Sequence, residues 1–278
     1  MMRVMLFAYP AWHSLSPAMH NAAFASLGLD ARYTAREVPP EALPEAVEEL
    51  RQPDCWGANV TIPHKESIMG LLDALSAEAR AVGSVNTIVR RGSELEGHST
   101  DVSGFLKALA DLRVDLAGRR VLLLGAGGAG RAVAYALLLS GIGELVLHNR
   151  TRERAERLRD DFAGLGEIRV IGDEELCECG PRSQLVINST SVGMMREGVR
   201  TDETPLPAGD LPKEGAVVDL VYRPAETRLL REAKAAGLKT QNGLPMLVYQ
   251  GAESFSMWTG HTAPVELMRR EARRMLAS

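Results

Sequence analysis

The sequence has little of what marks secreted, membrane or nucleic-acid-binding proteins. It holds only 3 cysteines in 278 residues, an odd count that does not form the framework of a disulfide-rich secreted domain. No apolar run is long enough to span a bilayer. Lysine plus arginine (32) nearly balance aspartate plus glutamate (36), so the net charge of −4 gives no reason to expect nucleic acid or an anionic membrane as a partner. We therefore expect a cytoplasmic protein whose ligand is a small molecule.

Two short patterns resemble a signal peptide and a zinc site, but both have simpler explanations. The N-terminal "MMRVMLFAYP" has only a brief apolar stretch before polar residues, so it predicts a first strand rather than a signal peptide. Cys177-Glu178-Cys179 resembles part of a zinc site, but no second Cys or His pair lies at zinc-site spacing in the sequence. We expect free thiols in a reducing compartment and no metal.

Short apolar runs alternate with helical patterns through most of the chain, which is typical of an α/β protein with mainly parallel sheets. The first hundred residues predict strands at Val4–Tyr9, Arg32–Val38, Gly57–Ile62 and Thr87–Arg90, with a hairpin turning at Gly92-Ser93. Predicted helices there are Pro17–Leu27, Glu41–Arg51 and Lys65–Leu75. Later strands are predicted at Val121–Leu124, Leu145–His148, Leu185–Asn188 and Ala216–Val221. Later helices are predicted at Ala225–Ala236, Leu244–Trp258 and Val265–Leu276.

A glycine-rich loop follows the aliphatic run at Val121–Leu124 and opens a helix inside a β-α-β unit. Its residues are Gly125, Ala126, Gly127, Gly128, Ala129 and Gly130. In this context Gly125 permits a tight turn, Gly127 lets the backbone approach a pyrophosphate, and Gly130 lets helix and strand pack closely. The helix N-terminus adds unpaired N–H groups and a partial positive charge. The segment predicts a dinucleotide site of the doubly wound Rossmann type.

The residues after the second strand of this unit favour NADP over NAD. An NAD site usually places Asp or Glu there to accept from the ribose 2′-OH. This chain has Asn149-Arg150-Thr151, followed by Arg152 and Arg154. Guanidinium groups pair with a 2′-phosphate, which an acid would repel. Some of these arginines, such as Arg152 or Arg157, are alternatively the solvated face of a charged helix.

Polar residues follow several predicted strands in the N-terminal part, where open α/β sheets bind ligands. Ser14 and Ser16 precede a helix, Thr61 and Lys65 lie in "ANVTIPHK", and Asn86 lies in "GSVNT". Each of them taken singly is explained at least as well by a helix cap or a turn.

The stretch "GHSTDVSGF" raises the same choice for a carboxylate. Ser99, Thr100, Asp101 and Ser103 could each begin a helix as its N-cap. Taken alone, Asp101 is better explained as such a cap. If it served chemistry instead, which the first turn of a helix permits for an anion, Ser103 or the Thr100 hydroxyl would serve the backbone.

Taken together and in order, these motifs resemble the shikimate dehydrogenase family, and the related quinate/shikimate dehydrogenases share most of them. The matching motifs are "HSLSPAMHNAAF", "GANVTIPHK", "GSVNT", "TD", "LLGAGGAGRA", "NRTRER", "VINSTSVGM", "VVDLVY" and "NGLPMLVYQGA". The resemblance implies a substrate-binding catalytic domain at 1–101 plus 238–278, and an inserted NADP-binding Rossmann domain at 102–237. It leaves the oligomeric state open, with a homodimer as one option.

The resemblance also implies site residues. Lys65 and Asp101 match the catalytic pair beside the reacting oxygen. The substrate residues implied are Ser14 and Ser16, with Tyr222 near them, for the carboxylate, and Thr61, Asn86 and Gln250 for the ring hydroxyls. The 2′-phosphate clamp implied is Asn149, Arg150, Thr151 and Arg154. The remaining cofactor contacts implied are Thr190, Ser191, Met194, Leu220 and Gly243, beside the glycine-rich loop.

The implied activity is the reversible NADPH-dependent reduction of 3-dehydroshikimate to shikimate, in chorismate and aromatic amino-acid biosynthesis. Lys65 and Asp101 would handle the proton, and which of them holds it at rest stays open. Two alternatives remain: a quinate/shikimate dehydrogenase with broader substrate choice, and a non-catalytic dinucleotide-binding relative. The sequence departs from the family pattern at Ala8, His64, Ser99 and Val102, of which Ser99 puts the rigidity of Asp101 in question.

Overall fold

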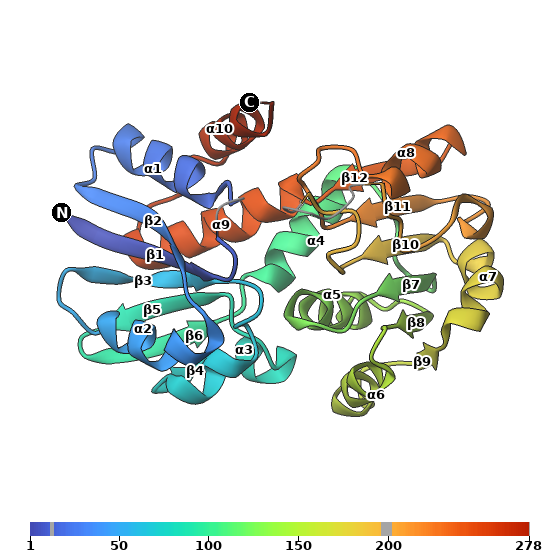
Figure 1. Ribbon diagram of the computed structural model, residues 1–278, viewed down its shortest axis with the longest axis horizontal. Coiled ribbons are helices and arrows are strands. Elements are labelled where there is room, and N and C mark those ends of the chain that lie inside the picture. The colour runs from blue at the N-terminus through green and yellow to red at the C-terminus, as the bar shows by residue number, and fades with distance from the viewer. Residues whose placement is uncertain (12–13, 196–201, 278) are drawn as a thin grey trace. The chain divides into compact units, whose positions relative to one another are not determined.

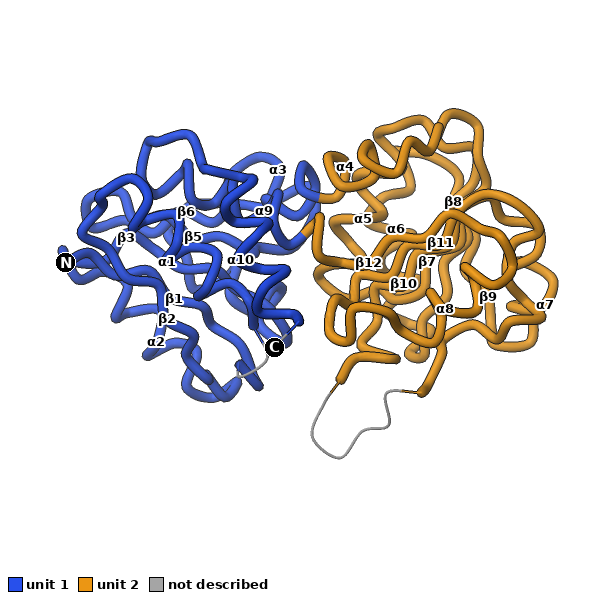
Figure 2. Tube along the Cα trace, turned by 90° about the horizontal axis from the view of Figure 1, so that it is seen from above, with its two compact units in different colours: residues 1–104, 247–278 blue, residues 105–246 orange. Residues whose placement is uncertain are grey.

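The computed structural model describes residues 1–11, 14–195 and 202–277 (Figure 1). The chain forms two compact units (Figure 2). Unit 1 comprises Met1–Gly104 and Leu247–Ser278, and unit 2 comprises Phe105–Met246. The chain thus changes units at 104/105 and 246/247, against the expected 101/102 and 237/238. Both changes fall inside helices, α4 (Asp101–Leu112) and α9 (Leu244–Thr259).

Unit 1 contains a six-stranded sheet in the order β2-β1-β3-β5-β6-β4. Its strands are β1 (Met2–Ala8), β2 (Ala31–Glu37), β3 (Cys55–Val60), β4 (Ala74–Leu75), β5 (Thr87–Arg91) and β6 (Glu94–His98). The other helices of the unit are α1 (Ser16–Ser26), α2 (Leu43–Glu49), α3 (Ala77–Val82) and α10 (Val265–Ala277). Strand β1 pairs in parallel with β2 and β3, whereas β5 runs antiparallel to β3 and β6. The hairpin predicted at Gly92-Ser93 is confirmed by the β5–β6 pairing.

The helix predicted at Lys65–Leu75 is wrong. Only Ser67–Leu71 is helical, as a short 3₁₀ segment, and the chain is extended again at Leu72 before it enters β4. Gly70 weakens a helix at this position because its backbone loses more freedom on folding than any other residue. Leu72 and Leu75 instead pack over Gly97 of β6, where a β-carbon would lie within 2.8 Å of their methyl groups. Tertiary burial overrides the apolar pattern here.

Unit 2 contains a six-stranded, fully parallel sheet in the order β12-β11-β10-β7-β8-β9. Its strands are β7 (Arg120–Leu124), β8 (Glu144–His148), β9 (Ile168–Ile171), β10 (Leu185–Asn188), β11 (Ala216–Asp219) and β12 (Lys239–Asn242). Its own helices are α5 (Gly128–Leu139), α6 (Arg152–Asp161), α7 (Leu176–Cys179) and α8 (Arg228–Ala235). The central strands are buried on both faces, as the aliphatic runs predict for a parallel sheet.

The strand order of unit 2 reverses beside β7. The chain proceeds from β7 outward through β8 and β9, then returns to β10 on the other side of β7. In an open parallel sheet this reversal creates a crevice at the carboxyl ends of the strands, where ligands bind. The glycine-rich loop follows β7 directly and therefore lies at this crevice.

Candidate functional site

The glycine-rich loop of unit 2 has glycines where a side chain would have no room and one where it would meet nothing. Gly125 has φ +109°, and a β-carbon there would lie 2.6 Å from Ser189 Oγ. A β-carbon on Gly130 would overlap the carbonyl oxygen of Gly125, so this glycine lets α5 pack against β7. A β-carbon on Gly127, in contrast, would meet nothing within 4 Å. The loop combines two glycines required by packing with one that leaves open space.

Asn149 joins this loop to the segment after β8. Its Oδ1 accepts from the Ala126 amide at 3.0 Å, and its Nδ2 donates to the Thr151 carbonyl oxygen at 2.7 Å. Both polar atoms of the side chain therefore bond to backbone, which sets the position of the predicted 2′-phosphate clamp. Arg150, Thr151 and Arg154 follow with exposed side chains.

The remaining cofactor candidates lie on three neighbouring strand ends of unit 2. Thr190, Ser191 and Met194 follow β10, Leu220 follows β11, and Gly243 follows β12. A β-carbon on Gly243 would overlap the carbonyl oxygen of Leu220, so this glycine lets the ends of β11 and β12 approach closely. Tyr222 also belongs to unit 2, whereas the other five predicted substrate residues belong to unit 1.

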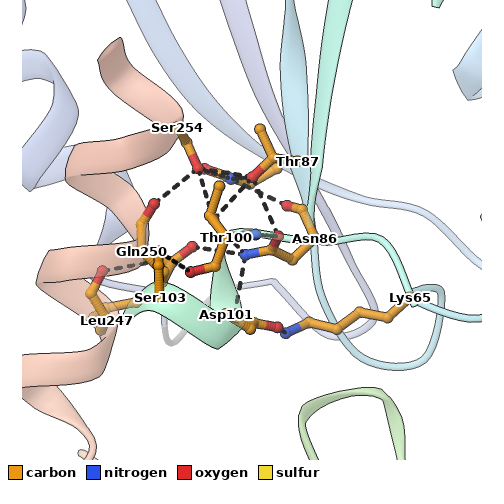
Figure 3. Close-up of polar contacts among 10 residues, drawn as sticks. Lys65, Asn86, Thr87, Thr100, Asp101, Ser103, Leu247, Gln250 and Ser254 are labelled. Atoms are coloured by element: carbon orange, nitrogen blue, oxygen red, sulfur yellow. Dashed lines mark hydrogen bonds and ion pairs between the residues drawn. The ribbon is translucent and has the colours of Figure 1, made fainter. Parts of the chain in front are cut away.

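Lys65 and Asp101 meet in unit 1, although 36 positions separate them in the chain. Lys65 Nζ donates to Asp101 Oδ2, and the two side chains are 12% and 4% exposed (Figure 3). Lys65 comes from the turn after β3, and Asp101 is the first residue of α4. Asp101 is buried and Lys65 is mostly buried, so little water competes for this ion pair and the two charges are held in contact.

Asn86 completes the arrangement around the carboxylate. Its Nδ2 lies 3.0 Å from Asp101 Oδ1 and 3.0 Å from Gln250 Oε1, and its Oδ1 accepts from the Thr100 amide at 2.7 Å. Each carboxylate oxygen of Asp101 thus accepts from one protein donor and retains a lone pair for a further donor. The polar ends of four side chains thus lie together around the Asp101 carboxylate: those of Lys65, Asn86, Asp101 and Gln250 (Figure 3).

The two serines and Thr61 belong to the same unit, where Thr61 directly follows β3 and the serines lie between β1 and the start of α1. Ser14 Oγ accepts from the Ser16 amide at 3.2 Å, and Ser16 begins α1 without a side-chain cap. Thr61 follows β3, and its amide donates to the Phe7 carbonyl oxygen of β1 at 3.0 Å. Ser14 and Thr61 therefore follow neighbouring parallel strands, β1 and β3. His13, which begins the "HSLSP" motif, lies outside the described residues.

Comparison with known proteins shows the family to which the chain belongs. Three family models match the chain: the shikimate dehydrogenase substrate binding domain over residues 6–88, shikimate / quinate 5-dehydrogenase over 108–202, and the shikimate 5′-dehydrogenase C-terminal domain over 243–273. Shikimate dehydrogenase (NADP(+)) of Symbiobacterium thermophilum is 48% identical over 273 residues, which are 96% of this chain and 92% of that protein. The chain belongs to the shikimate dehydrogenase family.

Two further shikimate dehydrogenase comparisons support this. Shikimate dehydrogenase (NADP(+)) of Thermus thermophilus is 46% identical over 276 residues, 99% of each chain. The crystal structure of shikimate 5-dehydrogenase from that organism in complex with NADP(H) and shikimate matches with a TM-score of 0.88 at 45% identity, covering 99% of this chain and 100% of that one. The predicted α/β fold with a Rossmann-type domain is confirmed.

The shikimate dehydrogenase motifs do not reveal what supports Asn86. Ser254 of α9 lies 2.7 Å from Thr87 Oγ1 and 3.2 Å from Thr100 Oγ1, and all three hydroxyls are completely buried. Asn59 Nδ2 donates to Ser254 Oγ at 3.1 Å and to the Asn86 carbonyl oxygen at 3.1 Å. The sequence contains only a weak indication of this network. Asn59 and Thr87 are polar residues in apolar strands, and Ser254 lies one helical turn after Gln250.

The residues flanking Asp101 also differ from expectation. Thr100 Oγ1 lies in the buried hydroxyl network rather than at the helix backbone, whereas Ser103 Oγ lies 3.4 Å from the Thr100 carbonyl oxygen and within hydrogen-bond distance of the Glu253 carboxylate. Ser99 Oγ is buried and has no hydrogen-bond partner among the described residues. Asp101 is therefore held by Lys65 and Asn86, and the Ser99 side chain contributes no hydrogen bond to it among the described residues.

The described ranges contain neither a membrane span nor a metal-binding cluster. No helix there is long and apolar enough to cross a membrane. The same residues contain no cluster of three or more His, Cys, Asp or Glu side chains that could hold a metal ion. Cys55, Cys177 and Cys179 are free thiols.

Proposed function

We propose that this protein is an NADP-dependent shikimate dehydrogenase, which reversibly reduces 3-dehydroshikimate to shikimate in chorismate and aromatic amino-acid biosynthesis. The observation that carries the proposal is the buried Lys65–Asp101 pair, held by Asn86 in a chain of this family. An ammonium and a carboxylate in fixed contact suit a reaction in which an alcohol oxygen must gain or lose a proton. The comparison structure with NADP(H) and shikimate agrees with both reactants.

We assign proton handling to Lys65 and orientation to Asp101. When bound, NADPH supplies the hydride that reduces the ring ketone of the substrate. The ketone oxygen then gains negative charge, which the Lys65 ammonium stabilises before it delivers a proton. Asp101 holds Nζ through Oδ2, and its free lone pairs can accept a substrate hydroxyl. In the reverse direction Lys65 must be neutral to take the proton from the alcohol.

We assign the substrate contacts to two groups of residues. Ser14 and Ser16, with Tyr222, are the hydroxyls for the carboxylate, and a hydroxyl donor suits a carboxylate acceptor. Asn86 and Gln250 present amides to the same place as Asp101, which supports their assignment to the ring hydroxyls together with Thr61. The interaction of Gln250 with Asn86 leaves the second lone pair of Oε1 for a ligand.

The crevice of unit 2 fits the phosphates of NADP. The open space at Gly127 permits close approach of a pyrophosphate to backbone N–H groups at the start of α5. Arg150 and Arg154 carry exposed guanidinium groups suited to a 2′-phosphate, on the segment that Asn149 holds. We assign the nicotinamide side to Thr190, Ser191, Met194, Leu220 and Gly243.

We also infer a cytoplasmic location. Cys177 is an exposed free thiol, and exposed free thiols persist in compartments that keep cysteine reduced.

The proposal is tested by following formation of the reduced nicotinamide, NADPH or NADH, with shikimate or quinate as substrate and NADP or NAD as acceptor. We expect shikimate with NADP to give the highest kcat/KM of the four combinations. A higher value for quinate would favour a quinate dehydrogenase, because quinate differs by a ring hydroxyl and a saturated carbon beside the carboxylate. NADPH binding without any turnover of shikimate would instead indicate a dinucleotide-binding relative.

A further inference from the structure

Unit 2 contains a buried carboxylate for which the proposed reaction provides no role. Asp219 ends β11 and is completely buried. Its Oδ1 accepts from the Val221 amide at 3.0 Å and from Asn188 Nδ2 at 2.9 Å, and its Oδ2 accepts from Thr227 Oγ1 at 2.6 Å. All three donors are uncharged. Burying a carboxylate costs free energy because the group loses its hydration. We therefore ask which part of the structure this carboxylate holds that a neutral side chain would not hold as well.

Asn188 is the register partner of Asp219 on the neighbouring strand β10. Its Oδ1 accepts from the Thr190 amide at 3.0 Å and from Thr190 Oγ1 at 2.7 Å, and its Nδ2 also donates to the Val192 carbonyl oxygen at 3.2 Å. Thr190 Oγ1 in turn accepts from the Val192 amide at 3.1 Å. A single completely buried amide thus folds the chain from 188 to 192 into one turn.

The carboxylate fixes the orientation of that amide. An ionised carboxylate has no hydrogen to donate and only accepts hydrogen bonds. The edge of the Asn188 amide that faces Asp219 must therefore be its N–H₂ group. Asn188 Oδ1 then faces Thr190, as its two accepted hydrogen bonds require. Bonds to an ionised acceptor are roughly twice as strong as those to a neutral one. Asp219 and the Thr190 amide therefore select the same orientation of Asn188, and the carboxylate holds the turn after β10 through the Asn188 amide.

The same carboxylate also holds the two segments that follow β11. The Val221 amide binds Oδ1 in the loop that contains Leu220, and Thr227 caps α8 by accepting from the Leu230 amide at 3.3 Å. The Met195 amide donates to the Arg223 carbonyl oxygen at 2.9 Å, which ties the loop after β10 to the loop after β11. Asp219 is the point where these segments are joined.

We propose that Asp219, acting through Asn188, is a positioning residue that sets the loops assigned to the nicotinamide side of NADP. The proposal rests on the proposed function for the assignment of Thr190, Ser191, Met194 and Leu220 to the nicotinamide. Asp219 itself does not touch the reactants. Its contribution is the geometry of the loops, and a displacement of about 1 Å at a reacting group lowers turnover by up to about a hundredfold.

The test compares Asp219→Asn and Asn188→Ala with wild type and with Asp160→Asn, which alters an exposed carboxylate of α6. Asp219→Asn keeps the side-chain shape but replaces the charged acceptor, and Asn188→Ala removes the amide that folds the turn. Two readouts are made on folded protein. One is amide hydrogen exchange of the 186–195 segment without ligand. The other is steady-state kinetics, with kcat and KM for shikimate measured with NADP, and the isotope effect on kcat measured for reduction of 3-dehydroshikimate by NADPH deuterated at the transferable position.

We expect both variants to lose exchange protection at 190 and 192 and to lose about tenfold or more in kcat, with a larger isotope effect and little change in KM for shikimate. Asp160→Asn should match wild type in every readout. Unchanged exchange at 190 and 192, or a lowered melting temperature with unchanged kcat and isotope effect, would overturn the positioning role. Wild-type protein without shikimate turnover would overturn the proposed function instead, and the exchange readout would still show whether Asp219 sets the turn.

Discussion

The residues at the candidate site are of two kinds. Some are assigned to contact the reactants, and others hold those residues in position. Lys65 and Asp101 form the reactive pair, and Asn86 and Gln250 surround it with amides. Ser254 and Thr87 lie behind Asn86 and have no exposed surface. Substitutions of the first kind should change the chemical step, whereas those of the second kind should change the geometry on which it depends.

Replacing Lys65 with Ala should abolish most turnover. General acid–base catalysis by one side chain contributes about 10²- to 10⁴-fold, so we expect kcat to fall by about that factor. The NADP dissociation constant should stay near the wild-type value, because Lys65 belongs to unit 1 and the residues assigned to the cofactor belong to unit 2. The measurement is steady-state kinetics together with a binding titration of NADP.

Lys213→Ala, at an exposed lysine, is the control for Lys65→Ala. Since Lys65→Ala leaves the buried Asp101 without its cation, we also expect a lower melting temperature, and kinetics must be recorded well below it. A Lys65→Ala enzyme with wild-type kcat would contradict the catalytic assignment.

Replacing Arg150 with Ala should weaken NADP binding but not NAD binding. A hydrogen bond to a charged group contributes about 1.5–3 kcal/mol, which corresponds to about 10- to 100-fold in the NADP dissociation constant. Arg157→Ala, at an exposed arginine of α6, serves as the control and should leave both constants unchanged. An equal loss for NAD and NADP would refute a 2′-phosphate contact.

At the scale of elements, the glycine-rich loop makes a prediction that separates binding from stability. Gly130→Ala should lower the free energy of unfolding by about 1–3 kcal/mol, because its β-carbon would overlap the Gly125 carbonyl oxygen. Gly127→Ala should leave stability nearly unchanged, since its β-carbon meets nothing, and should weaken NADP binding by occupying the approach to the pyrophosphate. Thermal unfolding and NADP titration of both variants measure this. Wild-type NADP affinity in Gly127→Ala would contradict the assignment.

Helix α1 contributes a buried histidine that should make stability depend on pH. His20 is completely buried and stacks on Tyr33 with ring centroids 4.5 Å apart, and burial lowers the pKa of its imidazole to about 3. As pH falls below about 6.5, the unfolded chain binds a proton there before the folded chain does. Stability is therefore present above that pH and is lost toward the folded pKa, by about 1.4 kcal/mol per pH unit.

The matching variant is His20→Phe, which keeps an aromatic ring and removes the titration. Between about pH 7 and pH 4.5 its free energy of unfolding should fall by about 3 kcal/mol less than that of wild type. His261→Phe, at an exposed histidine, should follow wild type at every pH. Parallel curves for His20→Phe and wild type in chemical unfolding would show that His20 does not carry this dependence.

The elements that the sequence predicts well are those whose pattern and burial agree. Val121–Leu124 and Leu185–Asn188 are aliphatic runs that lie inside a parallel sheet, and both are strands as predicted. Strand β12, "KTQN", is polar and lies at a sheet edge, so no apolar period marks it. The Lys65–Leu75 segment has a helical apolar pattern, but its leucines are only partly buried, and the chain pairs with β6 through the short strand β4 instead. The apolar pattern indicates which residues are buried, whereas the tertiary fold determines whether a strand or a helix buries them.

For the whole molecule, the order of motifs predicts the residues assigned to the reactants but not their support. Lys65, Asn86 and Asp101 stand in short motifs that can be matched one by one, and they do meet in unit 1. Ser254 meets Thr87 across 167 residues of chain, and Asp219 meets Asn188 across 31. Serine, threonine, asparagine and aspartate are common in every protein, so only the fold shows which of them pair.

The central claim is that this protein transfers hydride from NADPH to 3-dehydroshikimate and protonates the product. The most direct test is to incubate purified protein with 3-dehydroshikimate and NADPH carrying deuterium at the transferable position. The product is then analysed by mass spectrometry and NMR. We predict shikimate with one deuterium on the ring carbon that bears the new hydroxyl. Consumption of NADPH without labelled shikimate, or no consumption at all, would contradict the account.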